Sequence, residues 1–93
     1  MENFFYRVKE NDTVKSLSLK FKIPSTIIIY QNRLTEEISN GDLLFLTKTN
    51  DRIYTVELFD TLEIVAKKFC VSEEEILEKN KTPYLIYGEI III

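Results

Sequence analysis

The sequence predicts an α+β protein made of two tandem βααβ units, each a two-stranded antiparallel sheet with two helices on one face. Three observations lead to this prediction. Residues 54–80 contain the signals of a short strand followed by two helices. The same signals occur 48 residues earlier, and each copy closes with a glycine and an apolar run. We expect the first unit to span residues 4–48 and the second to span residues 52–93.

The elements of the second unit are marked in order along the sequence. Residues 54–57 alternate apolar and polar side chains and are rich in β-branched and aromatic types, which is typical of a strand. Asp60, with Glu63 three residues later, has the pattern of a capping box and predicts the start of a helix. Apolar residues then recur at i, i+3, i+4 and i+7, as on one face of a helix. Ser72 and Glu75 repeat the capping-box pattern, so a second helix is expected to follow.

An internal repeat places the same elements in the first half of the chain. Aligning Tyr6 with Tyr54, at an offset of 48 residues, pairs apolar positions with apolar ones and capping positions with capping ones. After a one-residue deletion, residues 41–46 align with residues 88–93. The paired positions include Val8/Val56, Asp12/Asp60, Thr13/Thr61, Val14/Leu62, Leu17/Val65, Phe21/Phe69, Ile23/Val71, Ile28/Ile76 and Asn32/Asn80. A match of this extent indicates a tandem repeat.

Each unit is close to the lower size limit for independent folding. The single cysteine, Cys70, excludes an intramolecular disulfide, and no group of residues has the spacing of a structural metal site. We therefore expect the two units to contact each other or a partner.

The order and spacing of these motifs resemble those of the LysM family of carbohydrate-binding modules. The resemblance covers residues 4–93. In the second unit it rests on Tyr54-Thr55-Val56, Asp60-Thr61-Leu62, Ile64-Val65-Ala66, Val71-Ser72, Asn80 and residues 88–93. In the first unit it rests on Tyr6-Arg7-Val8, Asp12-Thr13-Val14, Leu17-Ser18, Ile23-Pro24, Asn32-Arg33-Leu34 and residues 41–46.

The resemblance implies a non-catalytic module that binds N-acetylglucosamine-containing glycans such as peptidoglycan or chitin. It also implies a shallow groove in each unit, between the turn after the first strand and the loop after the second helix. The first groove would use Asn11, Asp12, Thr13, Asn32, Arg33 and Leu34, and the second would use Phe59, Asp60, Thr61, Asn80, Lys81 and Thr82.

The first turn of each unit departs from the family pattern, which has glycine before Asp-Thr. Here that position is Asn11 in one unit and Phe59 in the other. Asparagine tolerates a left-handed conformation and phenylalanine tolerates it poorly. We therefore expect the second turn to be shaped differently, which makes the first unit the better candidate for glycan binding.

Several of these residues also have structural interpretations. Asp12 and Asp60 are expected to act as helix N-caps more than as ligand contacts. Asn32 and Asn80 are expected to end their helices and to hold the loops that follow. Phe59 precedes a cap, where packing against a later helix residue as a hydrophobic staple is preferred over sugar stacking.

The last strand of each unit has apolar residues on both faces. Leu43 and Phe45 are expected to point away from the core, together with Phe5 from the first strand. Ile90 and Ile92 have the same expected orientation in the second unit. Two explanations remain open at this stage, since either the neighbouring repeat or a protein partner can cover such faces.

The composition excludes several classes of function. The net charge of −3, with no basic patch interleaved with aromatic residues, argues against nucleic-acid binding. The sequence has no histidine, no nucleophile–base pair, no phosphate-binding glycine loop and no metal-ligand spacing, so we expect no enzyme activity, cofactor or metal. No apolar run is long enough to span a membrane.

Two functions from different classes remain. The first is binding of peptidoglycan or N-acetylglucosamine oligomers. The second is a structural or adaptor role in an assembly, such as a spore coat, a phage tail or a tail-like particle, through self-association or an assembly partner. Residues 1–22 lack the pattern of a signal peptide. We therefore expect a cytoplasmic, spore-associated or particle-associated bacterial protein that reaches a cell wall, if at all, by a non-classical route.

Overall fold

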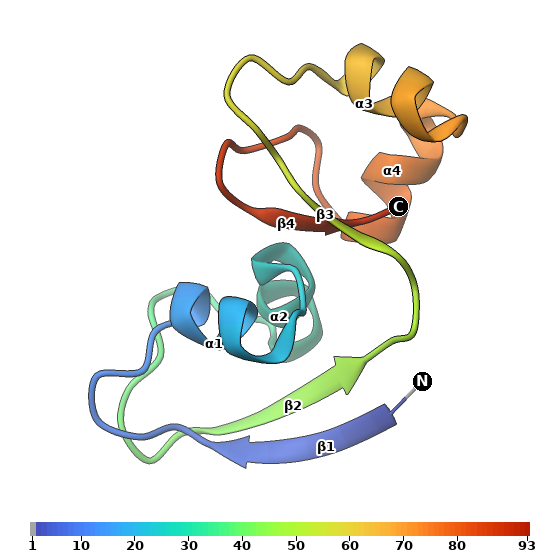
Figure 1. Cartoon of the computed structure of the whole chain (residues 1–93). Coiled ribbons are helices and arrows are strands. Elements are labelled where there is room, and N and C mark those ends of the chain that lie inside the picture. Colours follow the sequence, from blue (N-terminus) through green and yellow to red (C-terminus); the bar gives the residue numbers. More distant parts are fainter. Residues whose placement is uncertain (1) are drawn as a thin grey trace.

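Two βααβ repeats follow one another in the computed structural model, which describes residues 2–93 (Figure 1). Repeat 1 consists of β1 (Glu2–Arg7), α1 (Val14–Phe21), α2 (Ser25–Asn32) and β2 (Leu43–Lys48). Repeat 2 consists of β3 (Ile53–Thr55), α3 (Leu62–Phe69), α4 (Glu73–Asn80) and β4 (Ile90–Ile92). The predicted fold class is therefore confirmed.

Each repeat closes on itself through its first and last strands, which pair antiparallel. In repeat 1, Phe5 lies opposite Phe45 over a ladder that runs the length of β1 and β2. In repeat 2, Tyr54 lies opposite Ile91 in a shorter ladder. In this register, the side chains along each strand point alternately toward the helices of the same repeat and away from them.

Threonines, rather than the predicted aspartates, cap the first helix of each repeat. The Thr13 hydroxyl accepts a hydrogen bond from the Ser16 N–H at 3.0 Å, and Thr61 accepts one from the Ile64 N–H at 3.1 Å. The prediction that Asp60 forms the cap was wrong by one residue, because threonine also caps well and here has the extended backbone that a cap requires. The predicted Ser72 cap of α4 is confirmed.

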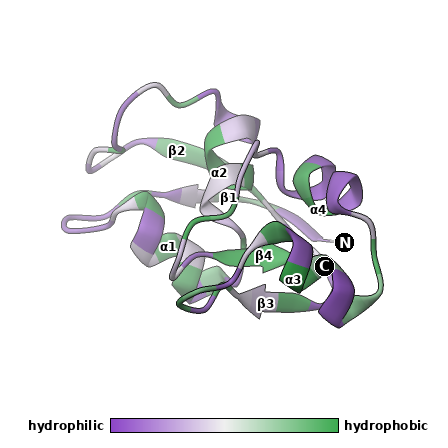
Figure 2. Ribbon diagram, turned by 90° about the horizontal axis from the view of Figure 1, so that it is seen from above, coloured by the Kyte–Doolittle hydropathy of each residue, from purple (hydrophilic) through white to green (hydrophobic). Residues whose placement is uncertain are grey.

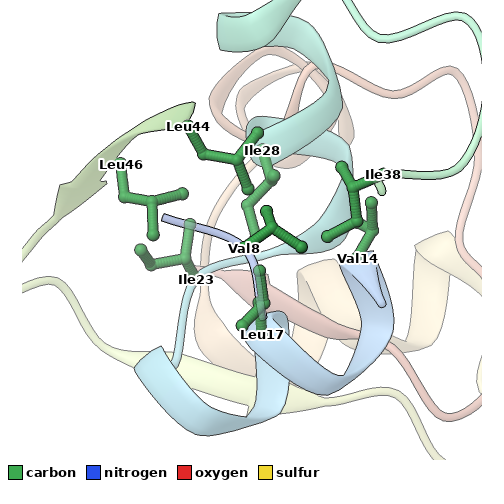
Figure 3. Close-up of a cluster of buried hydrophobic side chains, with 8 residues drawn as sticks. All are labelled: Val8, Val14, Leu17, Ile23, Ile28, Ile38, Leu44 and Leu46. Atoms are coloured by element: carbon green, nitrogen blue, oxygen red, sulfur yellow. The ribbon is translucent and has the colours of Figure 1, made fainter. Parts of the chain in front are cut away.

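A separate hydrophobic core lies inside each repeat, between the sheet and its two helices. The repeat 1 core, shown in Figure 3, consists of Val8, Val14, Leu17, Ile23, Ile28, Ile38, Leu44 and Leu46. The repeat 2 core consists of Val56, Val65, Ala66, Ile76, Ile91 and Ile93. Most of these positions correspond at the offset seen in the sequence, so the same packing is built twice.

The two repeats stack so that sheet and helix layers alternate. Figure 1 shows the β1–β2 sheet, then α1 and α2, then the β3–β4 sheet, then α3 and α4. A salt bridge joins Lys15 Nζ to Glu89 Oε2 across the two repeats at 2.8 Å. The Lys81 ammonium lies 5.3 Å from the centroid of the Tyr30 ring, also across the repeats. The expected contact between the units is therefore present.

Every helix in residues 2–93 has eight residues, and none is long and apolar enough to cross a membrane.

Candidate functional site

The turn that leads into the first helix has the same backbone in both repeats. Asn11 has φ 71° and Phe59 has φ 73°, so both lie in the left-handed region. The Asp12 N–H donates to the Lys9 carbonyl at 3.1 Å, and the Asp60 N–H makes the matching bond at 3.0 Å. The prediction that Phe59 reshapes the second turn was therefore wrong, because backbone hydrogen bonds fix the turn despite the conformational cost of a left-handed non-glycine residue.

Phe59 does not act as a hydrophobic staple. Its side chain is 86% exposed, and Ile64, the residue expected to pack against it, is also exposed. An exposed aromatic ring on a strained backbone contributes little to the stability of the fold. A strained residue of this kind is a candidate for a functional role.

The aspartate of each turn is engaged within its own turn. The Asp60 carboxylate accepts hydrogen bonds from the Glu57 N–H at 2.8 Å and from the Tyr54 hydroxyl at 2.5 Å. Asp12 accepts the equivalent pair of bonds in repeat 1. The tyrosine hydrogen bond lowers the pKa of Asp60 and, with partial burial of the ring, raises the pKa of Tyr54 to about 12. These carboxylates therefore hold the turn closed.

Asn32 and Asn80 join the second helix of each repeat to its last strand. The Asn80 amide donates to the Ile76 and Ile92 carbonyls, both at 2.8 Å, and its oxygen accepts from the Ile92 N–H at 2.7 Å. Asn32 makes the same three bonds to Ile28 and Phe45. Asn80 is fully buried, so its side chain stabilises β4 more than it stabilises the loop that follows α4.

The loop that follows the second helix begins with a left-handed residue in each repeat. Arg33 has φ 51° and Lys81 has φ 50°, and both side chains are exposed. In repeat 1 the Glu37 carboxylate accepts a hydrogen bond from the Val14 N–H at 2.6 Å, so this loop reaches the start of α1. Sequence analysis did not identify Glu37, because nothing local marks a bond across 23 residues.

Only the loop residues of the two predicted grooves line depressions on the surface, and the turn residues 11–13 and 59–61 line neither of these depressions. Arg33 and Leu34 line one shallow depression, and Lys81 and Thr82 line another. Tyr30 of α2 lines both depressions. Tyr30 was not among the predicted site residues, since only the stacking of the repeats places it there.

The two predicted interface sets have different environments. Phe5 and Leu43 are exposed on the β1–β2 sheet. Phe45 is half-buried; its ring lies 5.4 Å from that of Phe5, and it also lines the cleft that contains Ile92. Ile90 and Ile92 are 4% and 8% exposed, so they do not form an exposed partner surface. Figure 2 shows that β4 is hydrophobic along its length, and Figure 1 places it above α2. The neighbouring repeat covers this face.

Pockets at the junction show which residues of repeat 1 meet β4. Ser25 and Thr26 line one small cavity together with Ile90, and Pro24 and Ile27 line a cleft of about 340 Å³ together with Ile92. The start of α2 therefore lies against the outward positions of β4.

In residues 2–93, no group of three or more histidine, cysteine, aspartate or glutamate side chains is placed to hold a metal ion.

The sequence model of the LysM domain matches the chain twice, over residues 6–45 and 54–93. This chain belongs to the LysM family. LysM domains are binding modules for peptidoglycan and other N-acetylglucosamine-containing glycans, and they are not catalytic. The tandem pair predicted from the sequence is confirmed.

Two solved structures resemble the LysM pair. The spore cortex-lytic enzyme SleL of Bacillus cereus is 20% identical over the whole chain, with a TM-score of 0.50. SleL of Bacillus megaterium QM B1551 is 30% identical over 96% of the chain, with a TM-score of 0.48. The chain spans only 23% and 22% of these enzymes. A search among curated proteins finds no match.

Proposed function

We propose that this chain binds N-acetylglucosamine-containing glycan, of the peptidoglycan or chitin type, without catalysing a reaction. The match of both repeats to the LysM domain carries this proposal. The identical turns at Asn11 and Phe59 support binding by both repeats, because recognition through backbone groups depends on turn shape more than on side chains.

The proposed contacts divide into framework and ligand-facing groups. Asp12, Thr13, Asp60, Thr61, Asn32 and Asn80 hold the two loops through hydrogen bonds within their own repeats. The side chains of Asn11 and Arg33 in repeat 1 and of Phe59 in repeat 2 are exposed and available to a sugar. Leu34 is partly packed against its core, Lys81 is paired with Glu78, and Thr82 donates to the Tyr84 carbonyl. In each repeat, the backbone of the two loops is therefore fixed by hydrogen bonds, and the side chains next to it are polar or apolar.

Amide NMR during titration with N-acetylglucosamine oligomers tests this proposal. We expect chemical-shift changes at residues 11–13 and 33–34 of repeat 1, and at residues 59–61 and 81–82 of repeat 2. The absence of changes at millimolar sugar, with soluble and folded protein, contradicts glycan binding.

Arg33→Gly and Lys81→Gly are matched variants that separate the two repeats. Both positions have positive φ, where glycine is unstrained, so each substitution removes a side chain while the fold is retained. We expect each variant to weaken binding a few-fold in its own repeat alone. Isothermal titration calorimetry measures the loss, and equal binding by both variants and the parent chain means that these side chains do not contact sugar.

A second candidate is an assembly role, and the exposed face of the β1–β2 sheet favours it. Phe5, Leu43 and Phe45 occupy the positions that Ile53, Ile90 and Ile92 occupy in repeat 2, where the neighbouring repeat covers β4. If this face binds a second copy, a Phe5→Lys and Leu43→Lys double variant stays folded but becomes monomeric in light scattering. A parent chain that is already monomeric contradicts self-association.

A further inference from the structure

Tyr30 stands at the junction of the two repeats with most of its side chain in solvent. It is 60% exposed, although residues of both repeats surround it. On one side it lines a depression with Arg33 and Leu34 of repeat 1. On the other side it lines a depression with Lys81 and Pro83 of repeat 2. Each depression has a volume of about 580 Å³.

The surroundings of Tyr30 suit a sugar ring. A pyranose presents C–H groups on its faces and hydroxyl or acetamido groups at its edge, so an aromatic ring with polar groups at its rim recognises it. The Lys81 ammonium lies over one face of the Tyr30 ring, 5.3 Å from its centroid, and pairs with Glu78 at 2.9 Å, so a sugar would stack on the other face of the ring. Arg33 contributes a second cation, which lines the repeat 1 depression together with Tyr30.

The repeat itself indicates that Tyr30 is not required by the LysM fold. The counterpart of Tyr30 in repeat 2, 48 residues later, is the exposed Glu78. A residue needed for packing recurs in both repeats, as Leu17 and Val65 do at the centres of the two cores. Tyr30 therefore belongs to the junction between the repeats and not to the framework of either one.

We propose that Tyr30 forms an aromatic subsite that joins the two loop depressions, so that one glycan strand contacts both repeats. This inference rests on the proposed glycan binding and adds to it a preference for oligomers long enough to reach from Arg33 to Lys81. The Lys15–Glu89 salt bridge and the buried face of β4 hold the repeats in place before the ligand arrives. A strand that binds both depressions therefore avoids the cost of ordering the two repeats.

Calorimetric titration of three chains with the trimer and the hexamer of N-acetylglucosamine tests the subsite. We expect Tyr30→Ala to bind the hexamer about fivefold more weakly than the parent chain does, and to lose less affinity for the trimer, because only the hexamer reaches both of the depressions that Tyr30 lines. Tyr30→Phe keeps the ring and is expected to retain the affinity for the hexamer. Tyr87→Ala is the matched control, since Tyr87 is a similarly exposed tyrosine away from both depressions.

The outcomes separate this inference from the proposed function. If the parent chain binds the hexamer and Tyr30→Ala binds it equally well, glycan binding stands and the subsite is wrong. If Tyr87→Ala loses as much affinity as Tyr30→Ala, the loss is not specific to the junction and the subsite is also wrong. If the parent chain binds neither oligomer, the proposed function fails and the subsite fails with it.

Discussion

Replacement of Asn80 by alanine is expected to lower the free energy of unfolding by about 3 kcal/mol, a large share of the stability of a small domain. The Asn80 side chain is fully buried and satisfies both the N–H and the carbonyl of Ile92. Alanine removes both partners at once and leaves these two backbone groups buried without hydrogen bonds. Each group of this kind costs about 1–3 kcal/mol.

Asn32→Ala provides the matched control. Asn32 makes the same bonds to Phe45, but it is only partly buried, so water reaches the groups that lose their partner. We expect a smaller loss of about 1 kcal/mol. Urea unfolding of both variants, followed by circular dichroism and tyrosine fluorescence, gives the two values. Equal losses contradict the view that burial of Asn80 determines the difference.

Sequence periodicity was sufficient to predict the two repeats and the central residues of their cores, but not Ile38, which enters the repeat 1 core from the loop after α2. Leu17 and Val65 have the same spacing from their neighbours in the two copies, and both are fully buried. Periodic apolar residues indicate burial directly, because one helix face must be hidden from water. The order of strands and helices followed from the same signals.

Local rules did not predict the details of the turns. Both Asp60 and Thr61 are good cap residues, and only the observed hydrogen bonds show that threonine caps α3 while aspartate holds the preceding turn. The low propensity of phenylalanine for positive φ was overridden at Phe59 by the closed turn. Propensity is a weak guide wherever several hydrogen bonds fix the backbone.

The junction residues depend on how the repeats stack, which no local pattern specifies. Nothing in the sequence distinguishes Tyr30 from other helix residues. It contacts Lys81 only because the two repeats pack against each other. The sequence correctly predicted that Ile90 and Ile92 face away from the core of repeat 2. It left open whether repeat 1 or a protein partner covers them. The structure assigns that cover to repeat 1.

The helix surface of repeat 2 that corresponds to the covered surface of repeat 1 is acidic. The start of α2, which lies against β4, has the sequence Ser25-Thr26-Ile27, whereas α4 starts with Glu73-Glu74-Glu75. Three carboxylates at the equivalent surface disfavour contact with an apolar sheet face, because burial of an unpaired charge is costly. The acidic start of α4 therefore disfavours contact with an apolar sheet face of the kind that β4 presents to α2.

The substitution Ile90→Lys is expected to lower the free energy of unfolding by about 3 kcal/mol and to loosen the contact between the repeats. Ile90 of β4 is 4% exposed, and a lysine there has either to bury its ammonium or to displace the start of α2. Amide hydrogen exchange is expected to show the change at α2 and β4, while the core of repeat 1 stays protected, because that core lies below α2 and does not include Ile90.

Leu43→Lys is the matched control for Ile90→Lys, since the two residues occupy equivalent positions in the two sheets. Leu43 is 53% exposed, so its replacement is expected to change the free energy of unfolding by no more than about 0.5 kcal/mol. Urea unfolding of the two variants compares the same chemical change on a covered and on an open sheet face. Similar losses in both variants mean that the repeats do not stack in solution as they do here. A large loss confined to Ile90→Lys establishes that α2 covers repeat 2 and that the face around Leu43 remains open for a partner.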